Sequence, residues 1–299
     1  MSMMLILQDI ERILFATHMV KKMKWYNEKD LNCYTGTAED IKKYNQCCLI
    51  RRNLHPVVSE KYKNVVDDLE NNGYAVIRNA VDRERVLELS RETEELLKDP
   101  KNLKLNDTHL QMINQPLYTA RKAFNLATDD VLVNIASEFF KCTPALGSYN
   151  LKRSLVNNLQ AKDAQLYHCD GNSIKFLKFF FYLTDVDLES GPFTYVEGSH
   201  KRKFEGWKNK YRWDPLEIKS IYGADKIKHL MGRVGDVIIA NTTGFHRGYP
   251  PERKERMMLT VDYVVHPEYW KQPEFMLRQS DIDSLPLWKK PVADFMIRV

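Results

Sequence analysis

The chain has 299 residues, of which 43% are hydrophobic and 28% charged, a composition typical of a globular protein with a sizeable core. Five cysteines without a Cys-x-x-Cys pair argue against a disulfide framework and a structural zinc site, and no apolar run approaches the roughly 20 residues of a membrane span. The net charge of +5 is concentrated in residues 200–214, where six basic side chains face two acidic ones, so neither nucleic acid nor a membrane is an expected partner.

The chain is expected to begin with helices and one short strand. Apolar residues spaced by three and four predict an amphipathic helix within residues 1–20, which would dock on the domain or form a dimer contact. Ser59 is expected to cap a second helix that ends at Gly73. Residues 73–78 then predict a short strand.

Two further helices are expected before the middle of the chain. Asp82 caps the first, which stops near Pro100. Residues 100–127 lack a clear period. The second starts near residues 128–129, shows an apolar i, i+3, i+4, i+7 face and ends at Pro144.

After Gly147 the pattern changes to short runs rich in Tyr, Phe, Val, Ile and Thr between turn residues. The expected strands are Tyr149–Asn157, Ala164–His168, Lys175–Leu183, Phe193–Val196, Ile227–Met231, Asp236–Ala240 and Arg256–Val265. Many short strands predict a sandwich or jelly roll, packed against the N-terminal helices. We therefore expect one mainly β domain with flanking helices over residues 1–299: a mainly helical part with one or two strands (1–145), a jelly-roll core (146–265) and a C-terminal extension (266–299).

His168 and Asp170 lie at the end of a predicted strand. Because side chains alternate along a strand, the two would share a face while Cys169 points away. His246 follows the predicted strand 236–240 and suits a third ligand from a later strand. Two histidines and one carboxylate on one side of a metal are typical of non-haem Fe(II) oxygenases, although a His-x-Asp pair alone also fits a surface pair.

Arg256 opens the last predicted strand, ten residues after His246. A guanidinium beside a metal can clamp a carboxylate through two hydrogen bonds. 2-Oxoglutarate has two carboxylates, one for the metal and one for such a cation, so Arg256 is the candidate for its distal carboxylate. A solvated charge at a strand end is the alternative, and fits Arg253 and Lys254 better.

Four segments in this order resemble the phytanoyl-CoA dioxygenase (PhyH) family over about residues 70–265. They are the opening strand and helix start at 73–82, Gln165-Leu-Tyr-His-Cys-Asp170, the Gly-Ser-His segment at 191–201, and His246-Arg-Gly-Tyr-Pro-Pro with Arg256 and Tyr263 after it.

The resemblance implies a double-stranded β-helix, cupin-like fold and an Fe(II)-, 2-oxoglutarate- and O2-dependent dioxygenase. It implies iron ligation by His168, Asp170 and His246. It also places Tyr182 where the family contacts 2-oxoglutarate, with an aromatic of the barrel core as the alternative, and Asn158 as a second candidate. A carboxylate at Asp170 fills the position that chloride takes in related halogenases, so halogenation is not expected.

The resemblance implies hydroxylation of a small organic substrate with release of succinate and CO2, with desaturation or cyclisation by the same cofactors as alternatives. The basic segment 200–214 lies between predicted strands and could form a lid over an anionic or carrier-bound substrate, or be an ordinary surface loop. Rival functions are an inactive jelly-roll binding protein, a zinc hydrolase or isomerase, and an interaction protein that uses the N-terminal helices. A reducing, cytoplasmic setting is expected from the cysteines, and monomer and homodimer are both open.

Overall fold

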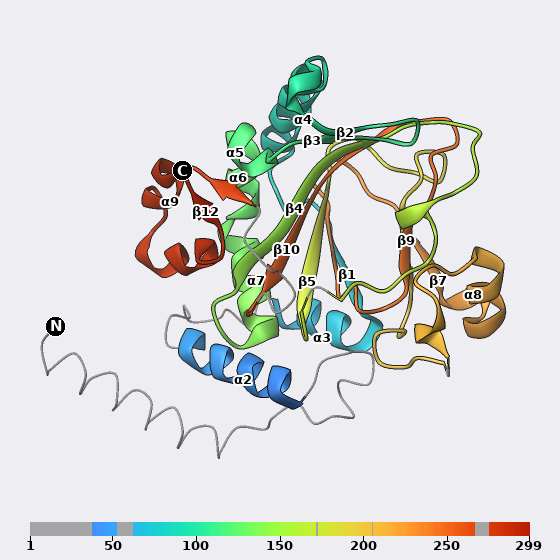
Figure 1. Ribbon diagram of the computed structural model, residues 1–299, viewed down its shortest axis with the longest axis horizontal. Coiled ribbons are helices and arrows are strands. Elements are labelled where there is room, and N and C mark those ends of the chain that lie inside the picture. The colour runs from blue at the N-terminus through green and yellow to red at the C-terminus, as the bar shows by residue number, and fades with distance from the viewer. Residues whose placement is uncertain (1–37, 53–61, 172, 205, 267–274) are drawn as a thin grey trace, which may run out of the picture.

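The computed structural model describes residues 38–52, 62–171, 173–204, 206–266 and 275–299. The expected N-terminal helix and the Ser59 cap lie outside these ranges. Two antiparallel sheets face each other, and helices cover the outer side of the larger one (Figure 1). This confirms the predicted double-stranded β-helix core with flanking helices.

The larger sheet has seven strands. Its order is β1 (Tyr74–Ile77), β8 (Val237–Ala240), β5 (Phe176–Tyr182), β10 (Arg256–Val264), β4 (Ala145–Ser154), β3 (Leu110–Ile113) and β2 (Leu103–Asn106). The smaller sheet has the order β7 (Ile227–Leu230), β6 (Phe193–Val196) and β9 (His246–Gly248). A parallel pair, β11 (Met276–Leu277) and β12 (Ile297–Arg298), lies beside the core in the C-terminal extension.

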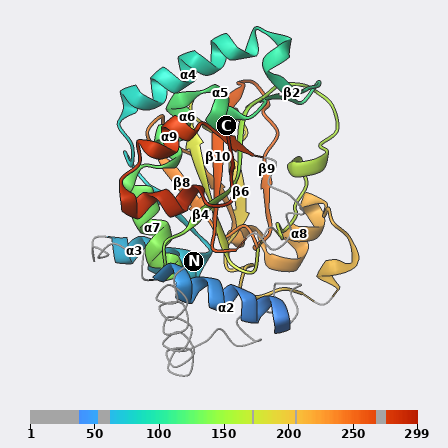
Figure 2. The same cartoon turned by 60° about the vertical axis from the view of Figure 1, so that its left-hand side comes forward.

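The helices divide between the two outer sides of the sandwich. Figure 2 shows the helices around α4 to α7, with α9, on the side of the large sheet, and α8 on the side of β9. Their bounds are α2 (Ala38–Arg52), α3 (Lys63–Asn72), α4 (Arg83–Leu97), α5 (Pro116–Thr119), α6 (Arg121–Ala127), α7 (Asp130–Phe140), α8 (Pro215–Tyr222) and α9 (Gln279–Asp283).

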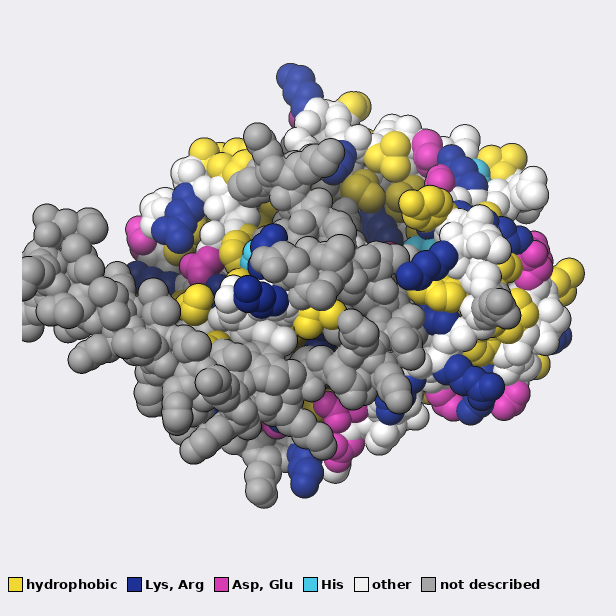
Figure 3. Space-filling view, turned by 60° about the horizontal axis from the view of Figure 1, so that its bottom comes forward, with side chains coloured by type: hydrophobic (Ala, Val, Ile, Leu, Met, Phe, Trp, Pro, Cys, Tyr) yellow, Lys and Arg dark blue, Asp and Glu magenta, His cyan; other side chains and the backbone are white. Residues whose placement is uncertain are grey.

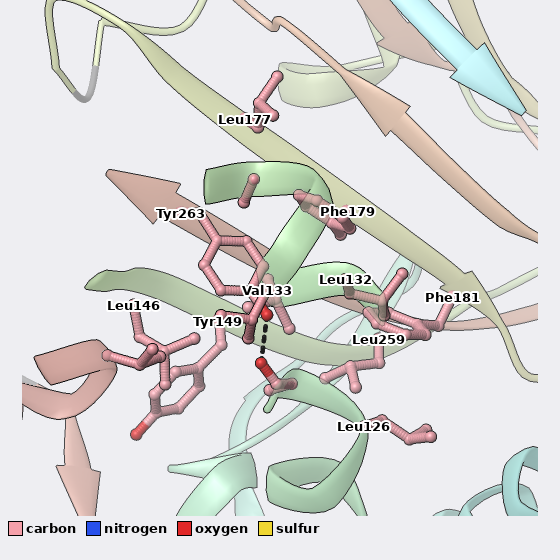
Figure 4. Close-up of a cluster of buried hydrophobic side chains, with 14 of the residues drawn as sticks. Leu126, Leu132, Val133, Leu146, Tyr149, Leu177, Phe179, Phe181, Leu259 and Tyr263 are labelled. Atoms are coloured by element: carbon pink, nitrogen blue, oxygen red, sulfur yellow. Dashed lines mark hydrogen bonds between the residues drawn. The ribbon is translucent and has the colours of Figure 1, made fainter. Parts of the chain in front are cut away.

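The strand β5 illustrates how the two cores arise from one alternating pattern. Leu177, Phe179 and Phe181 point to the helices, in a cluster that Figure 4 shows with Leu132 and Tyr263. The Tyr263 hydroxyl donates to the carbonyl of Ala127 at the end of α6 and so ties β10 to the helical layer. The intervening residues point to the small sheet, because successive side chains lie on opposite faces of a strand. Phe180 stacks there against Phe193 of β6, with ring centroids 4.0 Å apart.

Capping residues fix the ends of α3 and α4, the two helices on either side of β1 in the chain. Gly73 caps α3 with φ 87°, a left-handed conformation that favours glycine. A Cβ at this position would also overlap the Tyr195 hydroxyl and the His200 ring. Asp82 accepts a hydrogen bond from the backbone of Arg85 and caps α4, as predicted.

Three predicted elements differ from the structure. The strand expected at Tyr149–Asn157 runs from Ala145 to Ser154. Residues 164–168 do not form a strand: Asp163–Gln165 is a 3-10 turn, and Tyr167 and His168 make only isolated bridges, to Trp213 and His246. The helix α7 ends at Phe140, with Lys141 in the left-handed conformation, rather than at Pro144.

No helix within the described ranges is long and apolar enough to cross a membrane. On the face shown in Figure 3, lysines and arginines are interspersed with acidic and hydrophobic side chains over the described residues and do not form a continuous basic surface.

Candidate metal centre

Three metal-binding side chains meet between the two sheets. The ligand atoms of His168, Asp170 and His246 all lie within 4.8 Å of one another. The Nε2 atom of His168 is 3.6 Å from Asp170 Oδ1, and the Nε2 atom of His246 is 3.4 Å from Asp170 Oδ2. Two imidazole nitrogens and one carboxylate at these separations can share one divalent ion.

The backbone fixes the two histidines against each other. His168 and His246 form an isolated antiparallel bridge, in which each backbone N–H donates to the other's carbonyl, at 3.0 and 2.9 Å. The backbone N–H of Asp170 donates to the carbonyl of Thr242, 2.9 Å away. All three ligands therefore depend on the same main-chain pairing.

Both imidazoles present Nε2 to the centre. The Nδ1 atom of His168 lies 2.9 Å from the Leu166 carbonyl, and that of His246 lies 2.9 Å from the Gly244 carbonyl. A carbonyl only accepts hydrogen bonds, so each Nδ1 carries the proton and each Nε2 keeps its lone pair. Burial and the neighbouring His246 lower the pKa of His168 to about 3, which keeps that ring neutral. The residues present therefore fit a bound metal.

A lysine from β5 connects Asp170 to a second buried carboxylate. Lys178 Nζ donates to Asp170 Oδ2 at 2.8 Å and lies 3.6 Å from Asp262 Oδ1, while Ser148 donates to the other Asp262 oxygen at 2.6 Å. Burial alone would raise the pKa of Asp170, but Lys178 and the two imidazoles lower it well below its usual range. Asp262 sits where the pairing of β10 with β4 shifts register, and such bulges re-aim side chains.

A cavity of about 190 Å³ opens beside the triad. One wall is the inner face of the large sheet, where Lys152 and Ser154 of β4 and Arg256 of β10 line it. The opposite wall contains His168 and His246. The cavity extends past β4 to side chains of β3 and of the segment 162–165.

Among the cations that line the cavity, Arg256 is the best suited to bind a carboxylate. It is 3% exposed, and Nη2 donates to the Ser154 hydroxyl at 3.2 Å. Its Nε and Nη1 atoms are buried without a hydrogen-bond partner among the described residues. Buried donors are rarely left unpaired, so these two N–H groups suit a carboxylate in the cavity. This geometry fits the distal carboxylate of 2-oxoglutarate.

The other two candidate cofactor contacts lie elsewhere. The Tyr182 hydroxyl donates to the Leu230 carbonyl at 2.8 Å and accepts from the backbone N–H of Phe193 at 3.0 Å, in the core between the sheets. Asn158 lies beyond the end of β4 and is exposed. Neither side chain lines the cavity. The placement favours a structural role for Tyr182, and the amide side chains that line the cavity are those of Asn150 and Gln165.

A comparison with protein-family models matches residues 69–252 to "Phytanoyl-CoA dioxygenase (PhyH)". The match includes the triad and more than half of the chain. The chain belongs to the phytanoyl-CoA dioxygenase family.

Solved structures of similar fold include enzymes described with alpha ketoglutarate, which is 2-oxoglutarate. The chain resembles the epimerase SnoN in complex with Fe3+, alpha ketoglutarate and nogalamycin RO. The two share 17% sequence identity with a TM-score of 0.55, over 68% of this chain and 83% of that one. The carbocyclase SnoK from nogalamycin biosynthesis gives 19% identity, a TM-score of 0.53 and coverage of 68% and 83%.

HygX from Streptomyces hygroscopicus with nickel, 2-oxoglutarate and hygromycin B bound gives 20% identity, a TM-score of 0.51 and coverage of 72% and 90%. At these identities the likeness establishes the shared fold. No curated protein sequence matches this PhyH chain.

Sequence reasoning missed the other charged residues of this PhyH site. Lys178 is a lone lysine in the run Phe-Leu-Lys-Phe-Phe-Phe-Tyr, and Asp262 is a lone acid in β10. A single charge inside an otherwise apolar strand was the available signal, since such a residue needs a buried partner. Lys152 in β4 carried a weaker signal, because a second basic residue, Arg153, follows it.

The basic segment 200–214 does not reach the cavity. None of its described residues is among those that line it. Lys203 Nζ instead donates to the Thr243 carbonyl at 2.6 Å and to Cys169 Sγ at 3.0 Å. Phe204, Trp207 and Trp213 pack around Phe245 in a separate aromatic cluster.

Proposed function

We propose that the chain is an Fe(II)- and 2-oxoglutarate-dependent dioxygenase that hydroxylates a small organic molecule and releases succinate and CO2. One observation carries the proposal. A two-histidine, one-carboxylate cluster lies on a cavity of about 190 Å³. The same cavity is lined by a buried guanidinium whose Nε and Nη1 atoms have no hydrogen-bond partner among the described residues. Membership of the PhyH family supports the same cofactors.

Each side chain has a defined task in this proposal. His168, Asp170 and His246 hold the metal on one side, which leaves positions facing the cavity. Arg256 grips the distal carboxylate of 2-oxoglutarate and so sets its orientation. Lys178 keeps the Asp170 carboxylate ionised and directed at the metal position. Bound Fe(II) with 2-oxoglutarate would supply the oxidising chemistry by activating O2.

Hydroxylation is the proposed outcome, and desaturation or cyclisation is the alternative. The three products differ in composition: hydroxylation adds one oxygen atom, and the others remove two hydrogen atoms. Mass spectrometry of the product separates the first outcome from the other two.

A zinc hydrolase and a non-catalytic binding protein would use the same fold differently. Neither requires a buried arginine whose guanidinium N–H groups are unpaired beside the metal position. Neither would consume O2. Oxygen dependence of 2-oxoglutarate turnover therefore separates the proposal from both.

The test begins without a substrate. Purified protein titrated anaerobically with Fe(II) and then 2-oxoglutarate should develop a visible metal-to-ligand charge-transfer band. Asp170→Ala should lose it, and Asp225→Ala, which removes an exposed carboxylate outside the cavity, should keep it. Under air, a panel of small molecules should include ones that stimulate succinate release by the wild type and not by Asp170→Ala.

Arg256→Gln supplies the second arm of the test. It should retain Fe(II) binding and weaken 2-oxoglutarate binding by at least tenfold, because charge-assisted hydrogen bonds to the distal carboxylate are lost. Unchanged affinity for 2-oxoglutarate in this variant would show that another group holds the diacid. Absence of the band in the wild type would remove the proposed function altogether.

The cell compartment and the oligomeric state are separate proposals. The cysteines of the described ranges form no disulfide, and Cys48 and Cys142 contact each other inside the fold as thiols. This supports a reducing, cytoplasmic compartment. Size-exclusion chromatography of the whole chain, with and without residues 1–20, tests monomer against homodimer.

A further inference from the structure

Lys152 is a cation of the cavity wall that the proposed chemistry does not use. It lies on the inner face of β4, opposite Met258 of β10 and Met112 of β3 in the strand register. Its side chain lines the cavity and has no ion pair or hydrogen bond with another described residue. Burial, with Arg256 and Lys178 close by, lowers its pKa to about 8. A lysine in this position is suited to bind an anion that enters the cavity.

The charges of the inner cavity do not balance. Three cations, Lys152, Lys178 and Arg256, lie among two carboxylates, Asp170 and Asp262. Lys178 contacts both carboxylates, and Arg256 contacts only the Ser154 hydroxyl. A ferrous ion and a 2-oxoglutarate dianion together add no net charge. One positive charge next to the triad therefore has no carboxylate beside it, because the remaining acid of the cavity lining, Asp163, is exposed in the outer part. An unpaired charge is costly where water is partly excluded.

The position of Lys152 favours the substrate over the cosubstrate. In the large sheet, β4 lies between β10, which carries Arg256, and β3. Beyond Lys152 the cavity is bounded by Leu105, His109 and Leu110 and by the segment 162–165. In that outer part, Lys162 is already neutralised by Asp107, with Nζ 3.0 Å from Oδ2. Lys152 is thus a cation of the cavity wall, between Arg256 and the outer part, whose side chain has no partner among the described residues.

We propose that Lys152 binds an anionic group, a carboxylate or an equivalent singly charged acid, of the primary substrate. The inference rests on the proposed function and names the substrate class. The anion enters through the outer part of the cavity, and its ion pair with Lys152 places the remainder of the molecule at the metal. The basic segment 200–214, which lies off the cavity, is not needed for this recognition.

The test uses the iron- and 2-oxoglutarate-loaded protein without oxygen. Short straight-chain monocarboxylates and their matched primary amides are titrated in, and binding is followed by the shift of the visible charge-transfer band and by calorimetry. Three variants are compared with the wild type: Lys152→Met, Lys152→Arg and the control Lys226→Met, which removes a lysine outside the cavity. The affinity for 2-oxoglutarate is measured in each before the probes are added.

The wild type, Lys152→Arg and Lys226→Met should prefer a carboxylate over its amide by about tenfold or more, since an ion pair inside the cavity replaces a neutral contact. Lys152→Met should lose this preference while its affinity for 2-oxoglutarate changes by less than about threefold. Its charge-transfer band should form normally, which separates this result from failure of the proposed function.

Two results would overturn the inference. In the first, no carboxylate binds the wild type better than its amide. In the second, Lys152→Met weakens 2-oxoglutarate by about tenfold or more and leaves the carboxylate preference intact, so that Lys152 shares the diacid with Arg256.

Discussion

Lys178 lies between two buried carboxylates, and its ammonium group is the counter-ion of both. The side chains of Asp170 and Asp262 are 16% and 1% exposed, and the Lys178 Nζ atom lies 2.8 and 3.6 Å from them. Their attraction raises the pKa of Lys178 against the effect of burial, so the lysine stays charged. Removing one partner of a buried charge pair leaves the other charge without compensation.

We therefore expect Lys178→Met to lower the free energy of unfolding of the metal-free protein by roughly 3–5 kcal/mol. Lys226→Met removes a lysine that pairs with Glu197 at the surface and should cost less than about 1 kcal/mol. The double variant Lys178→Met/Asp262→Asn should recover part of the loss. Urea denaturation measures all three, and equal costs for the two lysines would show that the buried pair is not special.

The sequence alone predicted the residues whose side chains are typical metal ligands. His168, Asp170 and His246 were predicted to converge, and the structure brings them together, while their role as ligands stays a proposal. Lys152, Lys178 and Asp262 were missed because their meaning depends on strand register. The register that pairs Lys152 with Met258 and Lys178 with Asp262 places the two lysines at one cavity and Asp262 beside Lys178.

The helix α4 is capped by Asp82, the residue that precedes it. Asp82 accepts from the backbone N–H of Arg85, 3.1 Å away, and the buried face of the helix comprises Val86, Leu89, Thr93 and Leu97. A carboxylate at this position satisfies one unpaired N–H and interacts favourably with the positive end of the helix dipole.

Asp82→Ala should lower the free energy of unfolding by about 1 kcal/mol, whereas Asp82→Asn should stay within a few tenths, because asparagine caps equally well. Thermal and urea denaturation of the two variants compare them directly. Equal losses for both would attribute the effect to charge rather than to capping.

Elements with strong local patterns were predicted well. The end of α3, the start of α4 and the core strands β5, β6, β8 and β10 lie within one or two residues of their expected bounds. Elements that depend on a partner were missed: β2, β3, α5 and α6 in the aperiodic stretch 100–127, and the three-residue strand β9. Their backbone is ordered by tertiary pairing, which local propensity does not encode. The division into one domain with three parts stays a prediction.

The buried ring of His200 limits the stability of the whole protein at acidic pH. This ring is 9% exposed and its Nε2 atom lies 3.1 Å from the Glu70 carbonyl, where it joins the turn after β6 to α3. Burial lowers the pKa of His200 to about 4, and Lys201 and Lys203 act in the same direction. The native state therefore favours the neutral ring.

The stability that His200 contributes to the folded state decreases as the pH falls. A folded pKa of about 4 against an ordinary value of 6.5 gives a contribution to stability that is fully present above about pH 6.5 and is lost as the pH falls toward 4. Between pH 7 and pH 5 the wild type should lose about 2 kcal/mol more unfolding free energy than His200→Gln, whose amide does not titrate. Urea denaturation at both values tests this, and parallel losses would contradict it.

Because the two imidazoles are held together by reciprocal main-chain hydrogen bonds, the backbone fixes the spacing of the donors whichever ion binds them. A donor set of this kind ranks divalent metals by their intrinsic affinities, and cobalt, nickel, copper and zinc all rank above ferrous iron. Selectivity for iron must then come from which metals the cell makes available. Protein purified from a rich medium would carry whatever ions that medium offered, and its iron content would report supply rather than preference.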